Sequence, residues 1–387
     1  FLHEFVERLR KERKDIPPLL ELASKNGSFY KVEDGVLKFL DLEGNYTKVK
    51  RPRGMLLLSD IKRRSSPILK NGSASLWDIG DGVACLEFHS KMNAIDPDTL
   101  SMIVNSVDKV SNDYKALVLH NQGSNFSVGV NLGLALFALN VAAWPMMRDM
   151  VEQGQKAFKA LKFAPFPVVG APAGMALGGG CEVLLHCDAV QAHTESYVGL
   201  VEVGVGLIPG WGGCKELLVR GLSEKSGGFL SGGAMPTITK IFQNVGLAKV
   251  SRSAAEAIDL GYLRKNDGMT ANLDRLLGDA KERALQLVDQ YQAPTPVLIK
   301  LPGKSARVAL MMAVRALAKT RKATPHDLTV VEQLGIILTG GETDSTDGIS
   351  EDDLSGLELE ALVTLAKNPL TIARMEHMLE TGKPLRN

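Results

Sequence analysis

The chain has 387 residues, which is long enough for more than one typical domain and for a large apolar core. Its 45 Lys and Arg residues nearly balance its 44 Asp and Glu residues, so the composition gives no sign of nucleic-acid binding. No secretory signal peptide is recognisable. The four cysteines form no CxxC pair, which argues against a metal site and favours free thiols in a reducing, cytoplasmic setting.

The first residues, FLHEFVERLRKERKD, have the pattern of a charged amphipathic helix and do not begin with Met. We therefore expect a piece, or a processed part, of a longer protein. Helices should end near Asn26-Gly27, and a small β-hairpin with turns at Asp34-Gly35 and Gly44-Asn45 should follow. Residues 51–75 read as a basic, turn-rich linker. Its KRR run (62–64) is interpreted as a solvated face, with contact to the phosphates of a nucleotide-like cofactor as the alternative.

An alternation of apolar strands and helices begins near Leu76. The runs Ala84–Phe88 and Lys115–His120 predict buried strands, and the 3.6-residue period of Asn93–Val110 predicts a helix between them. This order favours a parallel sheet covered by helices. From Leu273 onwards the sequence is almost entirely helical, which predicts a C-terminal helical module. The expected domains are 1–75, 76–265 and 266–387.

The longest apolar stretch is Leu132–Met147, LGLALFALNVAAWPMM. It contains Asn140 and Pro145 and is shorter than the roughly 20 residues that span a bilayer. A membrane span is therefore not favoured. We expect a surface or lid helix that covers an apolar cavity, with an ordinary packed helix as the alternative.

The central stretch, residues 167–213, combines an apolar strand, a glycine turn and the start of a helix. Three glycines, 178–180, directly precede an apolar-periodic segment. Glycines allow close approach of a ligand to the backbone, and the first N–H groups of a helix attract a developing anion. Glu182 and Glu202 lie in otherwise apolar surroundings, where a carboxylate needs a partner or a task. Either one alone is also compatible with a capping or salt-bridged side chain.

Three segments carry a family resemblance: FSVGVNL (126–132), ALGGGCEVLLHCD (176–188) and VGLVEVGVGLIPGWGG (198–213). They resemble the signature segments of the enoyl-CoA hydratase (crotonase) superfamily, and SKMNAID (90–96) resembles its coenzyme A-contacting segment. The resemblance covers about residues 76–263 in the family's order and spacing. It implies an α/β, crotonase-like fold with repeated ββα units and parallel sheet layers covered by helices, followed here by the helical C-terminal module.

The resemblance also implies roles for individual residues. The backbone N–H groups of Val130 and Gly179 would form an oxyanion hole for the enolate-like thioester. Glu182 would activate water and Glu202 would protonate the α-carbon, with the two carboxyls titrating as a unit. The substrate-binding positions that the matched motifs imply are Lys91, Met92, Ala94, Ser127, Gly129, Gly178, Pro209 and Gly210.

The implied activity is the hydration of trans-2-enoyl-CoA to 3-hydroxyacyl-CoA in fatty-acid β-oxidation. No metal or redox cofactor is expected for this step, and the coenzyme A thioester enters as substrate. The NAD-binding glycine fingerprint is missing from this sequence. Residues 1–31 and the final RMEHMLETGKPLRN resemble parts of bacterial fusions of 3-hydroxyacyl-CoA dehydrogenase with hydratase. NAD and dehydrogenase activity are therefore expected only in a domain outside this chain.

The expected partners are acyl-CoA and either further copies of the chain or other β-oxidation enzymes, without nucleic acid or stable membrane insertion. Two alternatives remain for the activity. A Δ3,Δ2-enoyl-CoA isomerase needs only one carboxylate, and a non-catalytic acyl-CoA-binding or assembly module needs none. The presence of both glutamates favours hydration over these alternatives.

Three positions depart from the family pattern: Asn131 replaces an Asp, Trp211 a small residue and Cys214 a Thr. None of them removes a catalytic group. Trp211 is expected to narrow or reshape the site near the proline-glycine turn. The apolar stretch described above should wall the acyl pocket, so Leu136→Ala and Phe137→Ala are expected to shift preference toward longer chains.

Overall fold

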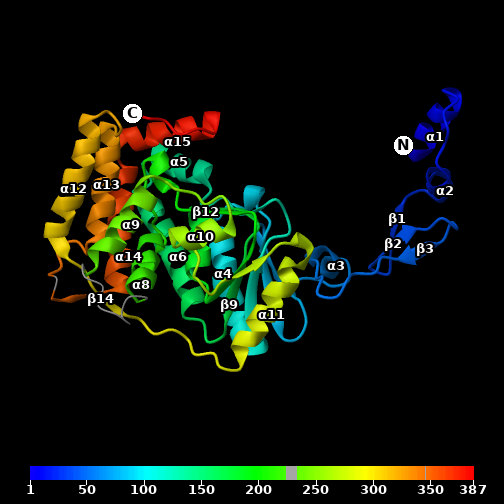
Figure 1. Cartoon of the computed structure of the whole chain (residues 1–387), viewed down its shortest axis with the longest axis horizontal. Coiled ribbons are helices and arrows are strands. Elements are labelled where there is room, and N and C mark those ends of the chain that lie inside the picture. Colours follow the sequence, from blue (N-terminus) through cyan, green and yellow to red (C-terminus); the bar gives the residue numbers. More distant parts are fainter. Residues whose placement is uncertain (224–232, 345) are drawn as a thin grey trace.

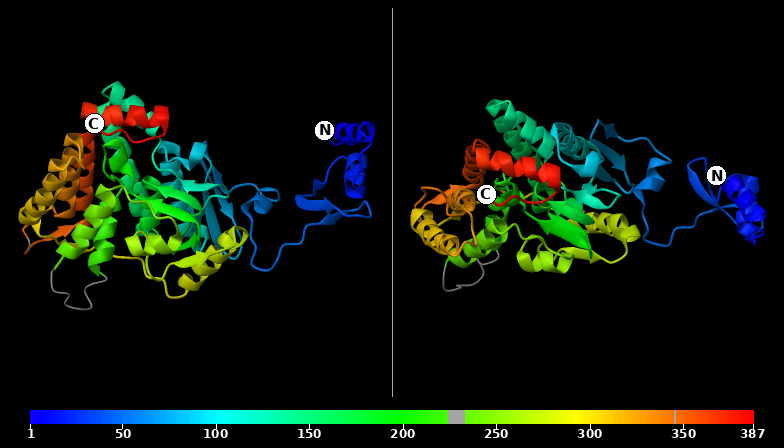
Figure 2. Two further views of the ribbon diagram at one scale, coloured as in Figure 1. Left: turned by 45° about the horizontal axis from the view of Figure 1, so that its top comes forward. Right: turned by 90° about the horizontal axis from the view of Figure 1, so that it is seen from above.

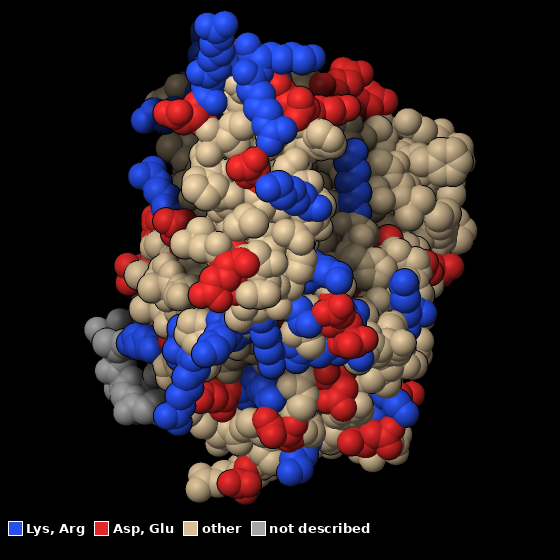
Figure 3. Space-filling model, turned by 90° about the vertical axis from the view of Figure 1, so that its right-hand side faces the viewer, with Lys and Arg blue, Asp and Glu red and all other residues tan. Residues whose placement is uncertain are grey.

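The computed structural model describes residues 1–223, 233–344 and 346–387. A body holds the chain from about residue 58 to the C-terminus, and an N-terminal arm extends from the side of residues 58–64 in all three views (Figures 1 and 2). On the side of the molecule that carries the arm, acidic and basic side chains are interspersed over most of the surface (Figure 3). This mixture agrees with the balanced charge of the sequence.

The arm consists of two helices and a three-stranded antiparallel sheet: α1 (Leu2–Lys11), α2 (Pro18–Asn26), β1 (Tyr30–Glu33), β2 (Val36–Leu40) and β3 (Tyr46–Lys48). Helix α2 ends at Gly27, whose φ of +94° confirms the predicted glycine cap. The predicted hairpin is the β1–β2 pair, and β3 adds a third strand.

A seven-stranded sheet with the order β13-β11-β9-β7-β6-β5-β4 forms the centre of the body. Its strands are β4 (Leu69–Lys70), β5 (Ala74–Asp78), β6 (Val83–Phe88), β7 (Ala116–His120), β9 (Val168–Ala171), β11 (Ala189–His193) and β13 (Gly268–Thr270). The strands from β6 to β13 pair in parallel, whereas β4 and β5 are antiparallel. Every residue of β6, β7 and β9 is buried, which explains their mostly apolar sequences. The predicted parallel sheet is confirmed, and β6 and β7 match the predicted strands within one residue.

A second, smaller sheet positions the glycine turns. Its three parallel strands, in the order β12-β10-β8, are β8 (Asn125–Ser127), β10 (Gly174–Leu177) and β12 (Ser196–Gly199). Because parallel strands end at the same edge, the turns after β8 and β10 lie side by side. The short helix α7 (Gly179–Leu185) starts from the second of these turns.

Helices cover both faces of the large sheet. Helices α4 (Pro97–Asp113) and α6 (Trp144–Lys162) lie in the larger of two apolar cores. In the smaller core, α11 (Leu276–Val288) packs against β7, β9 and β11. Strand β13 and helix α11 both follow residue 265, so the sheet layer extends past the predicted boundary. The remaining elements of the body are α3 (Leu58–Lys62), η1 (Lys91–Asn93), α5 (Leu132–Asn140), η2 (Glu202–Val205), α8 (Gly213–Ser223), α9 (Met235–Gly246), α10 (Ala254–Leu260) and η3 (Leu273–Arg275).

The apolar stretch Leu132–Met147 does not form the single helix that we expected. It forms α5 and the first turn of α6, and between them Ala142 has a φ of +53°. Pro145 lies in the first turn of α6, where its missing N–H leaves no helical hydrogen bond unmade. Among the described residues, no helix is long and apolar enough to cross a membrane.

The C-terminal helices pack on the body beside α5, α6, α8 and α9 (Figure 1). They are α12 (Gly303–Lys319), α13 (Pro325–Leu338), α14 (Glu351–Ala366) and α15 (Pro369–Thr381), joined by the antiparallel pair β14 (Leu298–Lys300) and β15 (Gly348–Ser350). The buried Lys162 ammonium of α6 lies 2.8 Å from Glu216 Oε1 in α8 and 2.5 Å from Glu351 Oε2 in α14. Because buried charges need their partners, this cluster fixes α14 against the body.

Candidate active site

Two glycine turns meet at the ends of β8 and β10. A Cβ atom placed on Gly129 would lie 2.8 Å from the Leu177 carbonyl oxygen and 3.0 Å from the Gly179 nitrogen, so the two turns are in direct contact. The φ angles are +90° at Gly129 and +54° at Gly178, which glycine adopts without a steric penalty. Glycine at these positions therefore allows the backbones to approach each other.

These turns leave two backbone N–H groups available. On either side of Val130, Ile95 N–H donates to the Gly129 carbonyl at 2.7 Å, and Asn131 N–H donates to the Ile95 carbonyl at 3.0 Å. Gly179 is the first residue of α7. The hydrogen bonds of the described residues include none from the N–H of Val130 or Gly179. Both groups can therefore donate to an oxygen atom that enters between the turns.

Glu182 lies in the first turn of α7 and is 2% exposed. Its Oε1 accepts hydrogen bonds from the backbone N–H groups of Trp211 at 2.8 Å and Gly213 at 2.9 Å. Burial, and secondly the charge of Glu202, raise the pKa of Glu182. The positive end of the α7 dipole acts in the opposite direction, but burial has the larger effect on this pKa.

Glu202 begins the 3₁₀ turn η2 and is partly exposed. Its Oε2 is nevertheless buried and has no hydrogen-bond partner, whereas its Oε1 lies 3.2 Å from the position of a Cβ atom on Gly178. Burial raises the pKa of Glu202, and the charge of Glu358 raises it further. A buried carboxylate oxygen without a partner is costly unless a ligand or water completes it.

A cavity of about 60 Å³ brings these groups together. Val130, Gly179, Glu182 and Glu202 all border it, although they come from separate segments of the chain. A space of this size holds a few water molecules. The remaining lining residues are almost all apolar: Ala135, Met147, Met150, Val151, Leu207, Ile208, Gly210, Trp211 and Leu362. The four residues predicted for catalysis and the oxyanion hole are thus neighbours in space.

Four of the predicted substrate-binding residues lie at or directly beside this cavity. Gly210 lines it, and Pro209 precedes Gly210 in the same buried turn. Gly129 and Gly178 form the two glycine turns. Their proximity to the carboxylates follows from the parallel pairing of β8 and β10.

The other four predicted positions are not among the residues of the described ranges that line the cavity; they lie in η1, directly after it, and at the end of β8. Lys91 and Met92 are exposed in η1, with Met92 at 47%, while Ala94 is buried. The Ser127 hydroxyl donates to the Asn93 carbonyl at 2.7 Å and accepts from the Gly129 N–H at 3.2 Å. Ser127 therefore links the segment after the first strand of the parallel sheet to the glycine turn.

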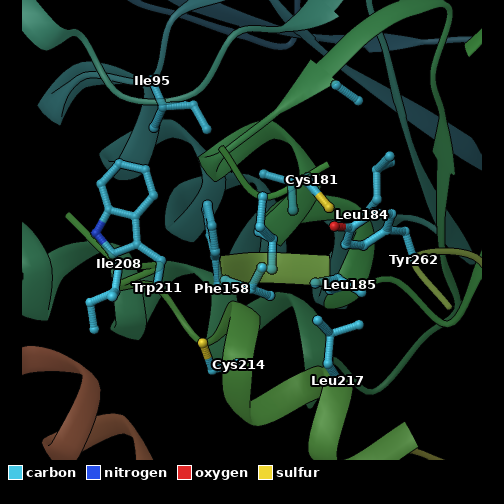
Figure 4. Close-up of a cluster of buried hydrophobic side chains, with 14 of the residues drawn as sticks. Ile95, Phe158, Cys181, Leu184, Leu185, Ile208, Trp211, Cys214, Leu217 and Tyr262 are labelled. Atoms are coloured by element: carbon cyan, nitrogen blue, oxygen red, sulfur yellow. The ribbon is translucent and has the colours of Figure 1, made fainter. Parts of the chain in front are cut away.

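Trp211 fills space beside Gly179. A Cβ atom on Gly179 would lie 2.6 Å from Trp211 Cζ3, and a Cβ atom on Gly154 in α6 would lie 2.1 Å from its Nε1. The indole ring makes an edge-to-face contact with Phe158, with ring centroids 5.4 Å apart (Figure 4). The ring thus occupies volume that a small residue would leave open, which agrees with the expected narrowing of the site.

The predicted acyl-pocket wall needs a correction. Ala135 and Met147 from the apolar stretch border the cavity, but Phe137 is 61% exposed. Leu136 is partly buried and is not among the described residues that line the cavity. Helix α5 is apolar on all sides, so its sequence did not indicate which side faces inward.

Sequence reasoning missed three residues that α6 and α14 bring to the site. Leu362 lines the cavity, and Gln155 Nε2 donates to the carbonyls of Gly210 at 2.8 Å and Ser355 at 2.9 Å. Glu358 accepts from two backbone N–H groups, one just before α8 and one in its first turn. Only Glu358 has a sequence signal, because it stands one turn after Leu354 in the apolar stripe of α14.

The KRR run and possible metal ligands do not add to the site. Lys62 pairs with Glu87, and Arg63 pairs with Asp60. Arg64 donates a hydrogen bond to a backbone carbonyl in the arm. These intramolecular contacts leave the phosphate-binding alternative without support. Within the described ranges, no group of three or more His, Cys, Asp or Glu side chains is placed to hold a metal ion.

Comparison with solved structures defines the class of fold. An enoyl-CoA hydratase from Bacillus halodurans matches 79% of this chain and 99% of its own, with a TM-score of 0.53 and 16% identity. An enoyl-CoA hydratase/isomerase from Xanthobacter autotrophicus Py2 matches 81% of this chain and 95% of its own, with a TM-score of 0.51 and 19% identity. The fold is crotonase-like, as the sequence predicted.

Sequence comparison matches part of the chain to a known family. Residues 78–226 match the family model for enoyl-CoA hydratase/isomerase. A Bacillus subtilis protein named "Probable 3-hydroxyacyl-CoA dehydrogenase" is 37% identical over 100% of this chain and 48% of its own length. The fatty acid oxidation complex subunit alpha of Idiomarina loihiensis is 38% identical over 36% of this chain and 20% of its own. The chain spans about half the length of the first of these relatives.

Proposed function

We propose that this chain catalyses the addition of water to the double bond of a trans-2-enoyl-CoA, giving 3-hydroxyacyl-CoA. The observation that carries the proposal is the cavity that both glutamates share with the free N–H groups of Val130 and Gly179. The matched family includes hydratases and isomerases of enoyl-CoA, and relatives named for fatty acid oxidation support a place in β-oxidation.

In the proposed reaction, the thioester carbonyl oxygen binds between the Val130 and Gly179 N–H groups. These donors stabilise the negative charge that develops on that oxygen as the water oxygen bonds to C3. Glu182 accepts a proton from the water, and Glu202 gives a proton to C2, so the reaction needs no oxidant or reductant. The raised pKa of the coupled pair suits this exchange, since one carboxyl must be protonated while the other is ionised.

The remaining predicted positions are assigned to the coenzyme A part of the substrate. We infer that Lys91, Met92, Ala94 and Ser127 line the path toward the thioester, as the family motif implies. The product would be the substrate of a 3-hydroxyacyl-CoA dehydrogenase, the activity for which the Bacillus subtilis relative is named. We propose that a longer protein containing this chain couples the two reactions.

The test is the loss of absorbance of crotonyl-CoA with wild type, Glu182→Gln and Glu202→Gln. Each variant should lose about 10³-fold in kcat, in the range that general acid–base groups contribute. Glutamine at 182 keeps a carbonyl oxygen for the Trp211 and Gly213 N–H groups, so the loss would report chemistry rather than misfolding. Glu152→Gln, on the exposed side of α6, serves as the matched control and should retain wild-type activity.

Three outcomes would contradict the proposal. Unchanged turnover in both glutamine variants would remove the pair from the mechanism. Isomerisation of a 3-enoyl-CoA without any hydration of crotonyl-CoA would instead support the one-carboxylate isomerase. Binding of acyl-CoA with neither activity would leave a non-catalytic binding module.

A further inference from the structure

The turn that holds Glu182 is itself held from the opposite side. Within residues 211–215, the backbone N–H groups of Trp211 and Gly213 donate to Glu182, whereas those of Gly212 and Lys215 donate to Glu358. The two distances to Glu358 are 2.6 Å from Gly212 and 2.8 Å from Lys215. One turn of backbone therefore lies between two carboxylates, and each carboxylate accepts hydrogen bonds from two of its N–H groups.

Glu358 comes from α14, outside the residues that match the family model. Its side chain is fully buried, at 0% exposure. Its Oε2 accepts from Gly212 and its Oε1 from Lys215, so each oxygen is engaged by the turn. Gly212 has a φ of +99°, and a Cβ atom there would lie 2.8 Å from the His186 ring. The turn has little room for another arrangement.

We propose that Glu358 is a positioning residue for Glu182: it fixes the turn whose N–H groups orient the Glu182 carboxylate. The inference deepens, and rests on, the proposed hydratase function. Without Glu358, the N–H groups of Gly212 and Lys215 would lose their acceptor and the turn would be free to shift. A shift of about 1 Å at a catalytic group can reduce a rate by about 100-fold.

Glu358 also acts on the charge balance of the site. The ionisable groups that face it are Glu182 from α7, Glu202 from η2, and Lys215 and Cys214 from α8. Burial, followed by the charge of Glu182, raises the pKa of Glu358 to about 8, and its own charge raises the pKa of Glu202. At the alkaline pH where Glu358 is ionised, removal of its charge should therefore lower the pKa of Glu202.

The test compares Glu358→Gln with Glu360→Gln. Both residues lie on α14, but Glu360 is 62% exposed and pairs with Arg148 at 2.7 Å. A glutamine at 358 presents an amide NH₂ to one of the two N–H groups, so one hydrogen bond is lost together with the charge. We expect kcat for crotonyl-CoA to fall about 10- to 100-fold with KM changed less than about threefold. The alkaline limb of the pH–kcat profile, which reports loss of the Glu202 proton, should move to lower pH, and Glu360→Gln should match wild type.

A merely structural role would leave the pH profile in place. An unshifted profile with unchanged kcat in folded Glu358→Gln, or the same change in Glu360→Gln, would overturn the inference. If Glu358→Gln does not fold, as judged by circular dichroism, Glu358→Asp takes its place. Aspartate keeps the charge and shortens the reach, so kcat should fall while the profile stays in place, and an unchanged kcat would overturn the inference.

A second readout separates this inference from the proposed function. Titration of ¹³C-labelled glutamate carboxyls by NMR follows the catalytic pair without any substrate. A wild type that hydrates no enoyl-CoA would refute the proposed function. A downward shift of the Glu202 titration in Glu358→Gln alone would still support the influence of Glu358, and coinciding titrations in all three proteins would refute it.

Discussion

Glu182 and Glu202 reach the same cavity from two regions that are held in different ways. All residues of α7 are buried, and the turn before it is fixed to the small sheet by the bond from Gly178 N–H to the Gly199 carbonyl at 2.9 Å. The turn η2 is held instead by α15. There, the Thr371 hydroxyl donates to the Gly206 carbonyl at 3.0 Å, and the Arg374 guanidinium donates to the Val203 carbonyl at 3.4 Å.

The two carboxyls also differ in their hydrogen bonds: one has an oxygen with backbone partners, and the other has a buried oxygen without any. Glu182 Oε1 already accepts two backbone N–H groups, whereas Glu202 Oε2 is buried without a partner. An oxygen without a partner is the one that gains most from a water molecule or substrate. Helix α15 supports the turn that carries Glu202, and α14 supports the turn that binds Glu182. These C-terminal helices therefore form part of the candidate site.

The comparison predicts that alanine at 182 costs more stability than alanine at 202. Glu182→Ala leaves the Trp211 and Gly213 N–H groups buried without an acceptor, at about 1–3 kcal/mol each. Glu202→Ala removes an oxygen that had no partner. We expect Glu182→Ala to be less stable than Glu202→Ala by about 2–6 kcal/mol. Urea unfolding near pH 5.5, where burial keeps both carboxyls largely protonated, measures this difference.

The matched glutamine variants control for side-chain volume. Glutamine at 182 still offers one oxygen to both N–H groups, so Glu182→Gln and Glu202→Gln should differ by less than about 1 kcal/mol. Equal stability of the two alanine variants would mean that water replaces the Glu182 carboxyl as acceptor. It would contradict the proposed difference between the two carboxyls.

The parts of the site that lie close together in the sequence were predictable. The period of the apolar residues indicated β6 and β7, and the glycine runs marked the turns at Gly129 and Gly178, because these signals depend on neighbours along the chain. The two glutamates stood out as charges within apolar runs.

Contacts between distant segments were not predictable in the same way. Glu358 lies 176 positions after Glu182, and only the packing of α14 on α8 brings them to one turn. The position of the Trp211 ring depends on the absence of a side chain at Gly154, a residue that carries no motif. Helix α5 offered no polar side to orient it, which is why the exposure of Phe137 was not foreseen.

Trp211 should influence which substrates fit, because its ring closes the side of the cavity next to α7. Trp211→Leu should open space beside Gly179 and raise the ratio of kcat/KM for decenoyl-CoA over crotonyl-CoA by about 10-fold, the effect of one or two accommodated methylenes. Phe137→Leu is the control, since its exposed ring should leave the ratio unchanged. Chain-length profiles of both variants measure the effect. If chain-length preference shifts in Phe137→Leu but not in Trp211→Leu, then α5 rather than Trp211 forms the wall of the acyl pocket.

The smallest expected effect is the contribution of Glu358, the carboxyl that α14 brings to the turn, to the pH dependence of stability. Burial raises the pKa of Glu358 to about 8 from its ordinary value of 4.5. Between these values the unfolded chain releases the proton while the folded protein retains it, so the folded state loses stability as pH rises. Glutamine does not titrate. The free energy of unfolding of wild type minus that of Glu358→Gln should therefore decrease by at least about 1 kcal/mol from pH 4.5 to 8. Urea unfolding across this window measures the difference, and parallel curves for the two proteins would show that Glu358 is already ionised in the folded protein at low pH.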